Sequence, residues 1–147
     1  MIVPLGGGGG VTRRAGLRRI KERLKNVSGA SGVRYEPSVI RPRTVIADID
    51  VGMFLGRAFP RGEGRIEIRW RPREGTDMRR VQWIDAEVSL GWHKDDDHSD
   101  LGTTHFQVDS GDEIGYGEGR IEVEAPLSFL ETCFERLPDR LADTART

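Results

Sequence analysis

The sequence predicts an α+β domain, in which a twisted antiparallel sheet, connected as a meander, carries a C-terminal helix on one face. Three observations support this. Ile66, Ile68 and Trp70 alternate with charged residues, as in a half-buried strand. The loops between the expected strands are short, which favours antiparallel neighbours over crossovers. After Pro126, apolar residues recur at helical spacing, so a terminal helix can cover the apolar face of the sheet.

The start of the chain predicts a separate lead-in and helix. Five consecutive glycines at positions 6–10 predict a flexible lead-in over residues 1–11, because glycine loses more conformational entropy than any other residue when its backbone is fixed. From Thr12, a suitable N-cap, apolar residues recur three and four apart among basic side chains, which predicts a basic amphipathic helix. Residues 12–32 are therefore interpreted as this helix and a linker, and residues 33–147 as a single α+β domain.

The rest of the sheet is expected from weaker patterns. Residues 44–55 are rich in Val and Ile and predict a strand. Residues 80–92 predict one strand with a bulge near residues 83–85, where the apolar residues change parity. Residues 104–109 and 120–124 predict the last two strands, with the glycine-rich segment between them forming a hairpin turn. The following residues are expected to line the apolar face: Ile66, Ile68, Trp70, Leu90, Trp92, Phe106, Val108, Ile121 and Val123, under Leu127, Leu130, Phe134 and Leu137 of the helix.

The charge of the chain is divided between its ends. Residues 1–43 hold ten Lys or Arg and two acidic residues, whereas residues 84–147 hold five and sixteen. A basic arm of this kind engages nucleic acid, an acidic partner or the acidic half of its own chain. The single cysteine predicts a reducing cytoplasm, and no apolar stretch reaches the roughly 18 residues that span a bilayer, so no membrane association is expected.

All three histidines lie between residues 93 and 105, beside four aspartates. If Trp92 faces Phe106 across a hairpin, so that both rings are buried, His93 faces His105 on the other side of the sheet. The loop above the pair would then carry His98 with Asp95, Asp96, Asp97 and Asp100. We therefore take His93, His98 and His105 as candidate catalytic residues.

Two histidines in this arrangement suit acid and base work on a phosphodiester. One neutral imidazole can take a proton from an attacking hydroxyl, and a protonated one can donate to the leaving oxygen. Arg69, Arg71 and Arg80 on nearby strands are candidate phosphate contacts. The aspartates do not fit a calcium loop, and the histidines match no zinc signature, so whether the loop binds a metal stays open and no cofactor is predicted.

The run His93-Lys94-Asp95-Asp96-Asp97-His98, with Thr104-His105-Phe106-Gln107 and a leucine-rich helix after Pro126, resembles the layout of TumE-type toxin proteins of toxin-antitoxin pairs. The resemblance covers residues 64–137, about half of the chain. It implies a partner antitoxin with a DNA-binding domain, and an action on RNA or translation.

Two classes of function therefore remain open. The first is a toxin-like cytoplasmic protein that acts on RNA through the histidine and aspartate loop; if it is an enzyme, it is ribonuclease-like. The second is a non-enzymatic module that binds nucleic acid or protein through its basic helix, using Arg13, Arg14, Arg18, Arg19 and Arg23. Geometry discriminates between them: the first class is favoured if His93 and His105 lie within reach of each other in a concave, partly buried site, and the second is favoured if they point apart into solvent.

Overall fold

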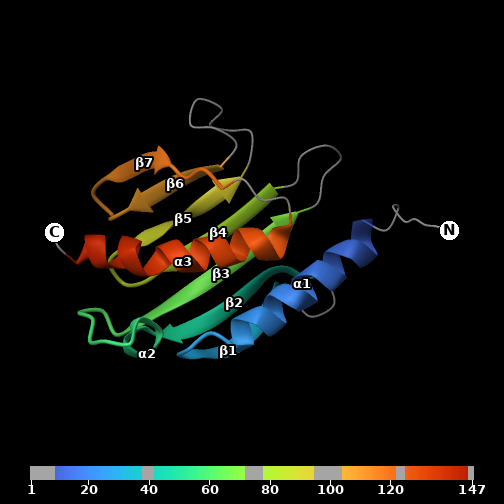
Figure 1. The fold of residues 1–147 in the computed structure, drawn as a ribbon, viewed down its shortest axis with the longest axis horizontal. Helices are drawn as coiled ribbons and strands as arrows, with labels where there is room; N and C mark the ends of the chain where they lie inside the picture. Colours follow the sequence, from blue (N-terminus) through green and yellow to red (C-terminus); the bar gives the residue numbers. More distant parts are fainter. Residues whose placement is uncertain (1–8, 38–41, 72–77, 95–103, 122–124, 146–147) are drawn as a thin grey trace.

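The computed structural model describes residues 9–37, 42–71, 78–94, 104–121 and 125–145. In chain order its elements are α1 (Gly9–Lys25), β1 (Ala30–Pro37), β2 (Pro42–Asp50), α2 (Val51–Leu55), β3 (Glu63–Arg71), β4 (Met78–Ile84), β5 (Ser89–Lys94), β6 (Thr104–Asp109), β7 (Ile114–Glu118) and α3 (Pro126–Thr144) (Figure 1).

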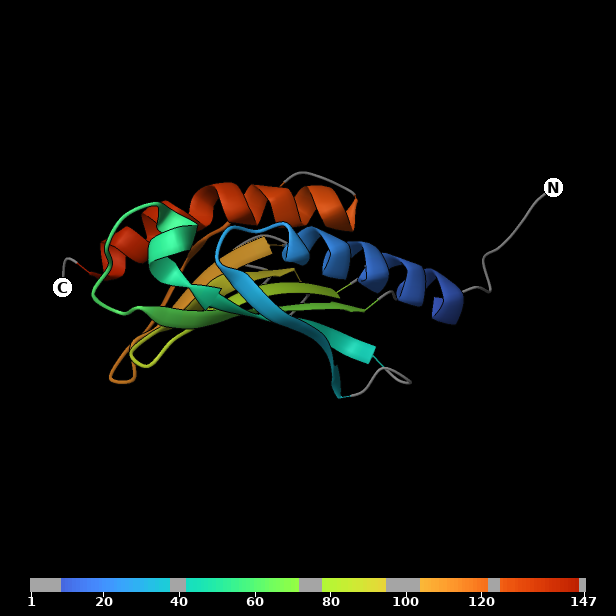
Figure 2. The same cartoon turned by 90° about the horizontal axis from the view of Figure 1, so that it is seen from below.

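The seven strands form one sheet in which spatial order equals chain order, and each neighbouring pair is antiparallel. Helices α1 and α3 lie on the same face of this twisted sheet (Figure 2). The predicted α+β class, the antiparallel meander and the C-terminal helix on one face are therefore confirmed. The opposite sheet face, which we call the open face, carries no helix among the described elements.

The core lies between the sheet and the two long helices. Of the residues expected to line the apolar face, Ile66, Ile68, Trp70, Leu90, Trp92 and Phe106 are buried together with Leu130, Phe134 and Leu137. Val108 and Leu127 pack against this core while partly exposed, and Val123 lies outside the described residues. No helix in the described part of the chain is long and apolar enough to cross a membrane.

Helix α1 belongs to the same core. It begins at Gly9, three residues before the expected cap at Thr12, and its Leu17, Ile20 and Leu24 are buried with the sheet residues. Gly29 turns the chain with a φ of 85°, so β1 starts within the segment interpreted as a linker. Residues 12–32 are therefore packed into the α+β domain, and β1 crosses the boundary expected at residue 33.

The single strand expected over residues 80–92 is two strands. A tight turn separates β4 from β5, because the carboxylate of Asp85 accepts the backbone N–H groups of Glu87 and Val88 at 2.8 and 2.9 Å. The backbone N–H of Asp85 in turn donates to the carbonyl of Val88 at 2.9 Å. The parity change that predicted a bulge is thus the reversal of the chain in a hairpin.

The last strand also lies earlier than expected. The predicted strand at residues 120–124 is wrong for residues 120 and 121, which follow β7 without belonging to a strand. The tight β6–β7 turn, in which Ser110 N–H donates to the carbonyl of Glu113 at 3.0 Å, returns the chain at once. Gly115 and Gly117 therefore belong to β7 and not to a hairpin turn. Ile121 is buried beyond the strand end.

Gly16 and Gly64 each pack directly against an indole ring, and we expect their replacement to destabilise the fold. A Cβ on Gly16 would lie 2.1 Å from the Trp70 ring, and one on Gly64 would lie 2.2 Å from the Trp83 ring. Gly16→Ala gains about 1 kcal/mol of helix propensity, but displacing a packed ring costs about 1–3 kcal/mol, so we expect a net loss. Urea unfolding measures this loss in the free energy of unfolding. Gly117→Ala, whose Cβ would meet open space, is the control and should change stability little; equal values for the variants would contradict the packing argument.

Candidate functional site

The predicted histidine pair is present on the open face. Trp92 pairs with Phe106 and His93 with His105 in the β5–β6 register, as expected. The two imidazole centroids are 5.1 Å apart, with ring planes at 80°. On the helix-bearing side of the same strands, the Trp92 and Phe106 rings also lie 5.1 Å apart. Burial of the aromatic pair therefore positions the histidine pair.

The histidine pair differs in exposure. His105 is only 1% exposed, whereas His93 is half-buried. The ring of Tyr116 on β7 lies 6.4 Å from His105, and Tyr116 is 50% exposed. His105 is thus enclosed between His93 and Tyr116. Both histidines lie on the open face, as expected, but His105 is as buried as a core residue.

Gln82 connects His93 to Arg80. Its Oε1 accepts hydrogen bonds from Arg80 Nε at 3.2 Å and from His93 Nε2 at 2.8 Å, and its Nε2 donates to the Ser89 hydroxyl. Gln82 is 5% exposed, so these bonds satisfy an amide that is expensive to bury unpaired. Gly91, the register partner of Gln82, makes room for it, since a Cβ there would lie 2.8 Å from Gln82 Oε1.

The network determines which nitrogen of His93 carries a proton. An arginine side chain only donates hydrogen bonds, so the Gln82 atom that faces Arg80 must be the carbonyl oxygen. The same oxygen contacts His93 Nε2, which must therefore donate. In the neutral ring the lone pair then resides on Nδ1, and Nδ1 is the atom of His93 that can act as a base.

We expect Gln82→Leu to remove this tautomer preference, because leucine has a similar volume but cannot accept a hydrogen bond. Nitrogen-15 NMR of the imidazoles should show the Nε2–H form of neutral His93 in the wild-type chain, and a mixture in the variant. Gln107→Leu, on β6 and half-buried, is the control and should leave His93 unchanged. A dominant Nδ1–H form in the wild-type chain would contradict the hydrogen bond that His93 Nε2 donates to Gln82.

The arginines predicted as phosphate contacts lie on the same face as the histidines. Strand register aligns Arg69 with Arg80 and Arg80 with His93, so one row across the sheet contains Arg69, Arg80, His93 and His105. Arg80 is exposed, and Arg71 is exposed at the end of β3. The Nε atom of Arg69 is buried and has no hydrogen-bond partner within the part of the chain that the structure describes. This row concentrates positive charge beside the imidazoles.

The remaining loop residues are not placed. His98, Asp95, Asp96, Asp97 and Asp100 lie outside the described residues. Within the described ranges, no group of three or more His, Cys, Asp or Glu side chains is arranged to hold a metal ion.

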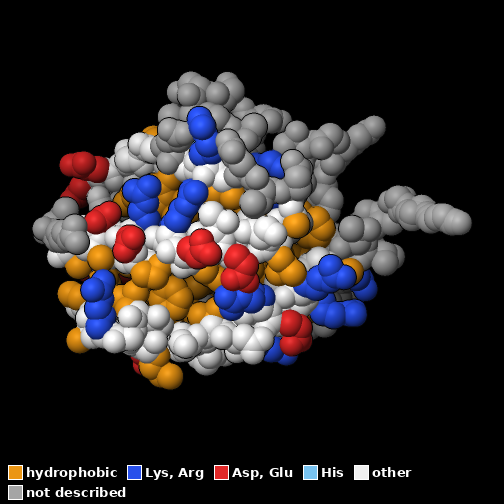
Figure 3. Space-filling view, in the orientation of Figure 1, with side chains coloured by type: hydrophobic (Ala, Val, Ile, Leu, Met, Phe, Trp, Pro, Cys, Tyr) orange, Lys and Arg blue, Asp and Glu red, His pale blue; other side chains and the backbone are white. Residues whose placement is uncertain are grey.

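The basic helix lies on the other side of the sheet. Arg14, Arg18 and Arg19 are exposed on α1, and Lys and Arg side chains gather over this helix in Figure 3. Arg23 instead binds Glu131 of α3, with Nη2 donating to Oε1 at 2.9 Å, and stacks on Phe134. The side chain of Arg13 lies outside the described residues. The two candidate surfaces thus lie on opposite faces.

Sequence reasoning missed Gln82, Ser89 and Tyr116. Gln82 has the same strand parity as Arg80, which places it on the open face, but the unrecognised turn at Asp85 hid its proximity to Ser89 and His93. Tyr116 was assigned to a turn because two glycines flank it.

In comparisons with known proteins, no family model matches the chain, and no significant match was found among curated proteins or solved structures.

Proposed function

We propose that this chain is a toxin-like enzyme that cleaves RNA, with His93 and His105 as its base and acid. One observation supports this above all: the sheet register aligns two arginines and two histidines in a single row on the open face. Its resemblance in layout to TumE-type toxin proteins points in the same direction. The short distance between the two imidazoles, one buried and one half-buried, supports the enzymatic hypothesis.

In the proposed step, Nδ1 of His93 takes the proton of a ribose 2′-hydroxyl, and the 2′-oxygen forms a bond to the adjacent phosphorus. The bond between phosphorus and the 5′-oxygen breaks, and the leaving oxygen takes a proton from protonated His105. The products are a 2′,3′-cyclic phosphate and a 5′-hydroxyl end. Water returns the proton balance, because His93 has gained the proton that His105 has lost.

The arginines would neutralise the phosphate. Arg80 is adjacent to His93 in the row, and Arg69 is adjacent to Arg80. Guanidinium groups match phosphate oxygens with two parallel N–H bonds, and they stabilise the charge that develops as the phosphorus becomes five-coordinate. A buried, unsatisfied Nε on Arg69 supports this role, since a bound phosphate would supply an acceptor.

The test uses the purified full chain with single-stranded RNA and with the DNA of the same base sequence. We expect RNA to be cleaved to fragments that end in cyclic phosphate, identified by mass spectrometry, and DNA to remain intact because it lacks the attacking hydroxyl. Expression of the chain alone should arrest growth of a host. Intact RNA together with normal growth would contradict the proposal. A cytoplasmic partner antitoxin that suppresses the arrest belongs to the same proposal.

A second candidate function rests on α1. Its exposed Arg14, Arg18 and Arg19 form a basic surface that is independent of the histidine row. Under this alternative the chain is a non-enzymatic module that binds nucleic acid or an acidic partner protein, and the histidines are structural.

We expect nucleic-acid binding through α1 to depend steeply on salt. Each phosphate contact releases condensed counterions, so replacing Arg14, Arg18 and Arg19 with alanine should reduce the slope of log affinity against log salt by up to about 3 for duplex DNA. Fluorescence anisotropy at several salt concentrations measures the slope. Arg57→Ala, an exposed arginine outside α1, is the control. A slope unchanged by the triple substitution would exclude α1 as the binding surface.

A further inference from the structure

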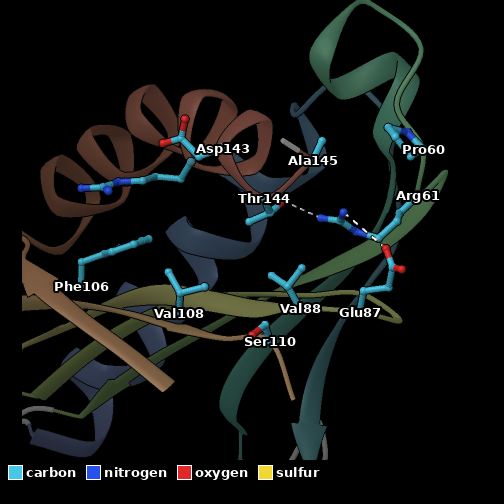
Figure 4. A pocket seen from close by; sticks show the side chains of 11 residues that line it. Pro60, Arg61, Glu87, Val88, Phe106, Val108, Ser110, Asp143, Thr144 and Ala145 are labelled. Atoms are coloured by element: carbon cyan, nitrogen blue, oxygen red, sulfur yellow. Dashed lines mark hydrogen bonds and ion pairs between the residues drawn. The ribbon is translucent and has the colours of Figure 1, made fainter. Parts of the chain in front are cut away.

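A cavity of about 480 Å³ opens between the C-terminal end of α3, the helix-bearing side of β6, the turn between β4 and β5, and the segment that precedes β3. This volume falls in the range of about 300–1,000 Å³ that is typical of small-molecule sites. Figure 4 shows Phe106, Val108 and Val88 along the sheet side of the cavity, with Asp143, Thr144 and Ala145 on the helix side. The cavity and the histidine row therefore lie on opposite faces of the sheet.

Next to two residues of the cavity wall, β7 carries glycine on the helix-bearing face. Register places Gly115 opposite Val108 and Gly117 opposite Phe106. Neither glycine has a positive φ, and a Cβ added to either would meet open space. Side chains at these two positions would fill the region beside Val108 and Phe106. Val108 and Phe106 therefore have no neighbouring side chain at their register positions on β7.

Two arginines, Arg61 and Arg140, line the cavity, and Arg61 is held by ion pairs with other residues of the fold. Arg61 donates from Nε to Asp85 at 2.8 Å and from Nη2 to the Thr144 hydroxyl at 2.7 Å, and it also pairs with Glu87 at 3.5 Å. Arg140 stacks on Phe106, with its guanidinium carbon 4.1 Å from the ring centroid. Across the described ranges, Arg140 forms no ion pair.

Stacking leaves the donors of Arg140 available in a specific direction. The contact with Phe106 uses the flat face of the guanidinium, whereas its N–H groups lie in the plane and point sideways. A carboxylate accepts two such N–H bonds in parallel. Asp85 and Glu87 neutralise Arg61, so Arg140 is the cation of the cavity left for a ligand. The carboxylate of Asp143 also lines the cavity, so the site suits a monoanion better than a doubly charged phosphate.

We propose that this cavity binds a small monocarboxylate with an apolar body, whose carboxylate pairs with Arg140 and whose apolar part contacts Val88, Phe106 and Val108. The apolar part is desolvated against these side chains, and the charge is held at the stacked guanidinium. This site is additional to the proposed RNA chemistry and does not depend on it.

Decanoate, used below its micelle-forming concentration, is the probe. Isothermal titration calorimetry on the full chain should show saturable binding to a single class of sites, and decanol, which lacks the carboxylate, should bind at least about tenfold more weakly. Arg140→Gln should weaken decanoate binding by about tenfold or more, and Arg140→Lys should fall between the two because it keeps the charge without the bidentate geometry. Arg57→Gln removes the same charge outside the cavity and should leave the affinity unchanged.

Two substitutions test the cavity itself. Val108→Trp and Gly117→Leu should each abolish decanoate binding by filling the space, and circular dichroism with thermal unfolding identifies any variant that fails to fold; Gly117→Leu introduces its Cβ into open space. Absence of decanoate binding to the folded wild-type chain would overturn the proposal. So would equal binding of decanol, or an affinity unaffected by Arg140→Gln. RNA cleavage by the same preparations reports separately on the histidine row.

Discussion

Cleavage of RNA is expected to fall by about 10²–10⁴-fold when either histidine of the pair is replaced, because each one carries a proton transfer in the rate-limiting step. His93→Ala removes the proposed base from a half-buried position. His105→Asn is preferable to alanine at the buried site, because it retains a polar side chain there and leaves a smaller cavity. Initial rates on a single-stranded RNA, with products identified by their cyclic phosphate ends, measure the effect.

The control for this prediction is Gln107→Ala, a half-buried residue on β6 that shares the open face but lies outside the row. Its rate should stay close to that of the wild-type chain. Added imidazole should partly restore His93→Ala, which a purely structural role for His93 would not permit. Wild-type rates in both single variants, with the fold intact, would leave the α1 binding module as the better hypothesis.

The histidine pair could be predicted because alternation and pairing are coupled in a sheet. Once Trp92 and Phe106 must both be buried, period-two geometry places His93 opposite His105, and a slip by one residue would expose an aromatic ring. The same alternation explains the predicted core positions of β3, whereas the 3.6-residue period of a helix explains those of α3. Patterns of this kind depend only on which side chains face the core.

The turn at Asp85 could not be predicted from alternation. Alternation of apolar residues continues through the turn from residue 84 to residue 92. The turn is stabilised by the side chain of Asp85, which accepts backbone N–H groups two and three residues ahead. Missing this turn also concealed Gln82, whose role depends on β4 lying antiparallel to β5. Strand β7 was missed for a related reason. Glycine has no apolar side chain, so the sequence around Gly115 and Gly117 lacks the alternation that identifies a strand.

Asp85→Ala is expected to lower the free energy of unfolding by about 3–5 kcal/mol, because it removes one partner of a buried ion pair. The Asp85 carboxylate is fully buried and the Arg61 side chain is 9% exposed, with Nε and Oδ2 2.8 Å apart. The same oxygen accepts the Trp83 indole N–H at 2.9 Å, and the other oxygen accepts the two turn amides. The substitution therefore leaves several donors unsatisfied at once. Urea unfolding measures the loss.

The pH dependence of stability gives this prediction a sign. Burial raises the pKa of Asp85, but hydrogen bonds from Trp83, Arg61 and the backbone amides outweigh burial and hold the pKa below its usual range. The folded chain therefore binds this proton less readily than the unfolded chain, whose aspartate titrates near pH 3.9. The stabilisation is fully present above that pH and is lost as the pH falls through the lower pKa of the folded state.

The difference in stability between the wild-type chain and Asp85→Asn should accordingly shrink as the pH is lowered below about 4, where the wild-type carboxyl is progressively protonated. Glu87→Gln supplies the control, since Glu87 is 67% exposed and its ion pair with Arg61 at 3.5 Å is screened by water. We expect it to change stability by less than about 0.5 kcal/mol at neutral pH. A loss for Asp85→Ala as small as that for Glu87→Gln would mean that the turn between β4 and β5 holds without its carboxylate, and that hydrogen bonds of the sheet itself determine where β4 ends.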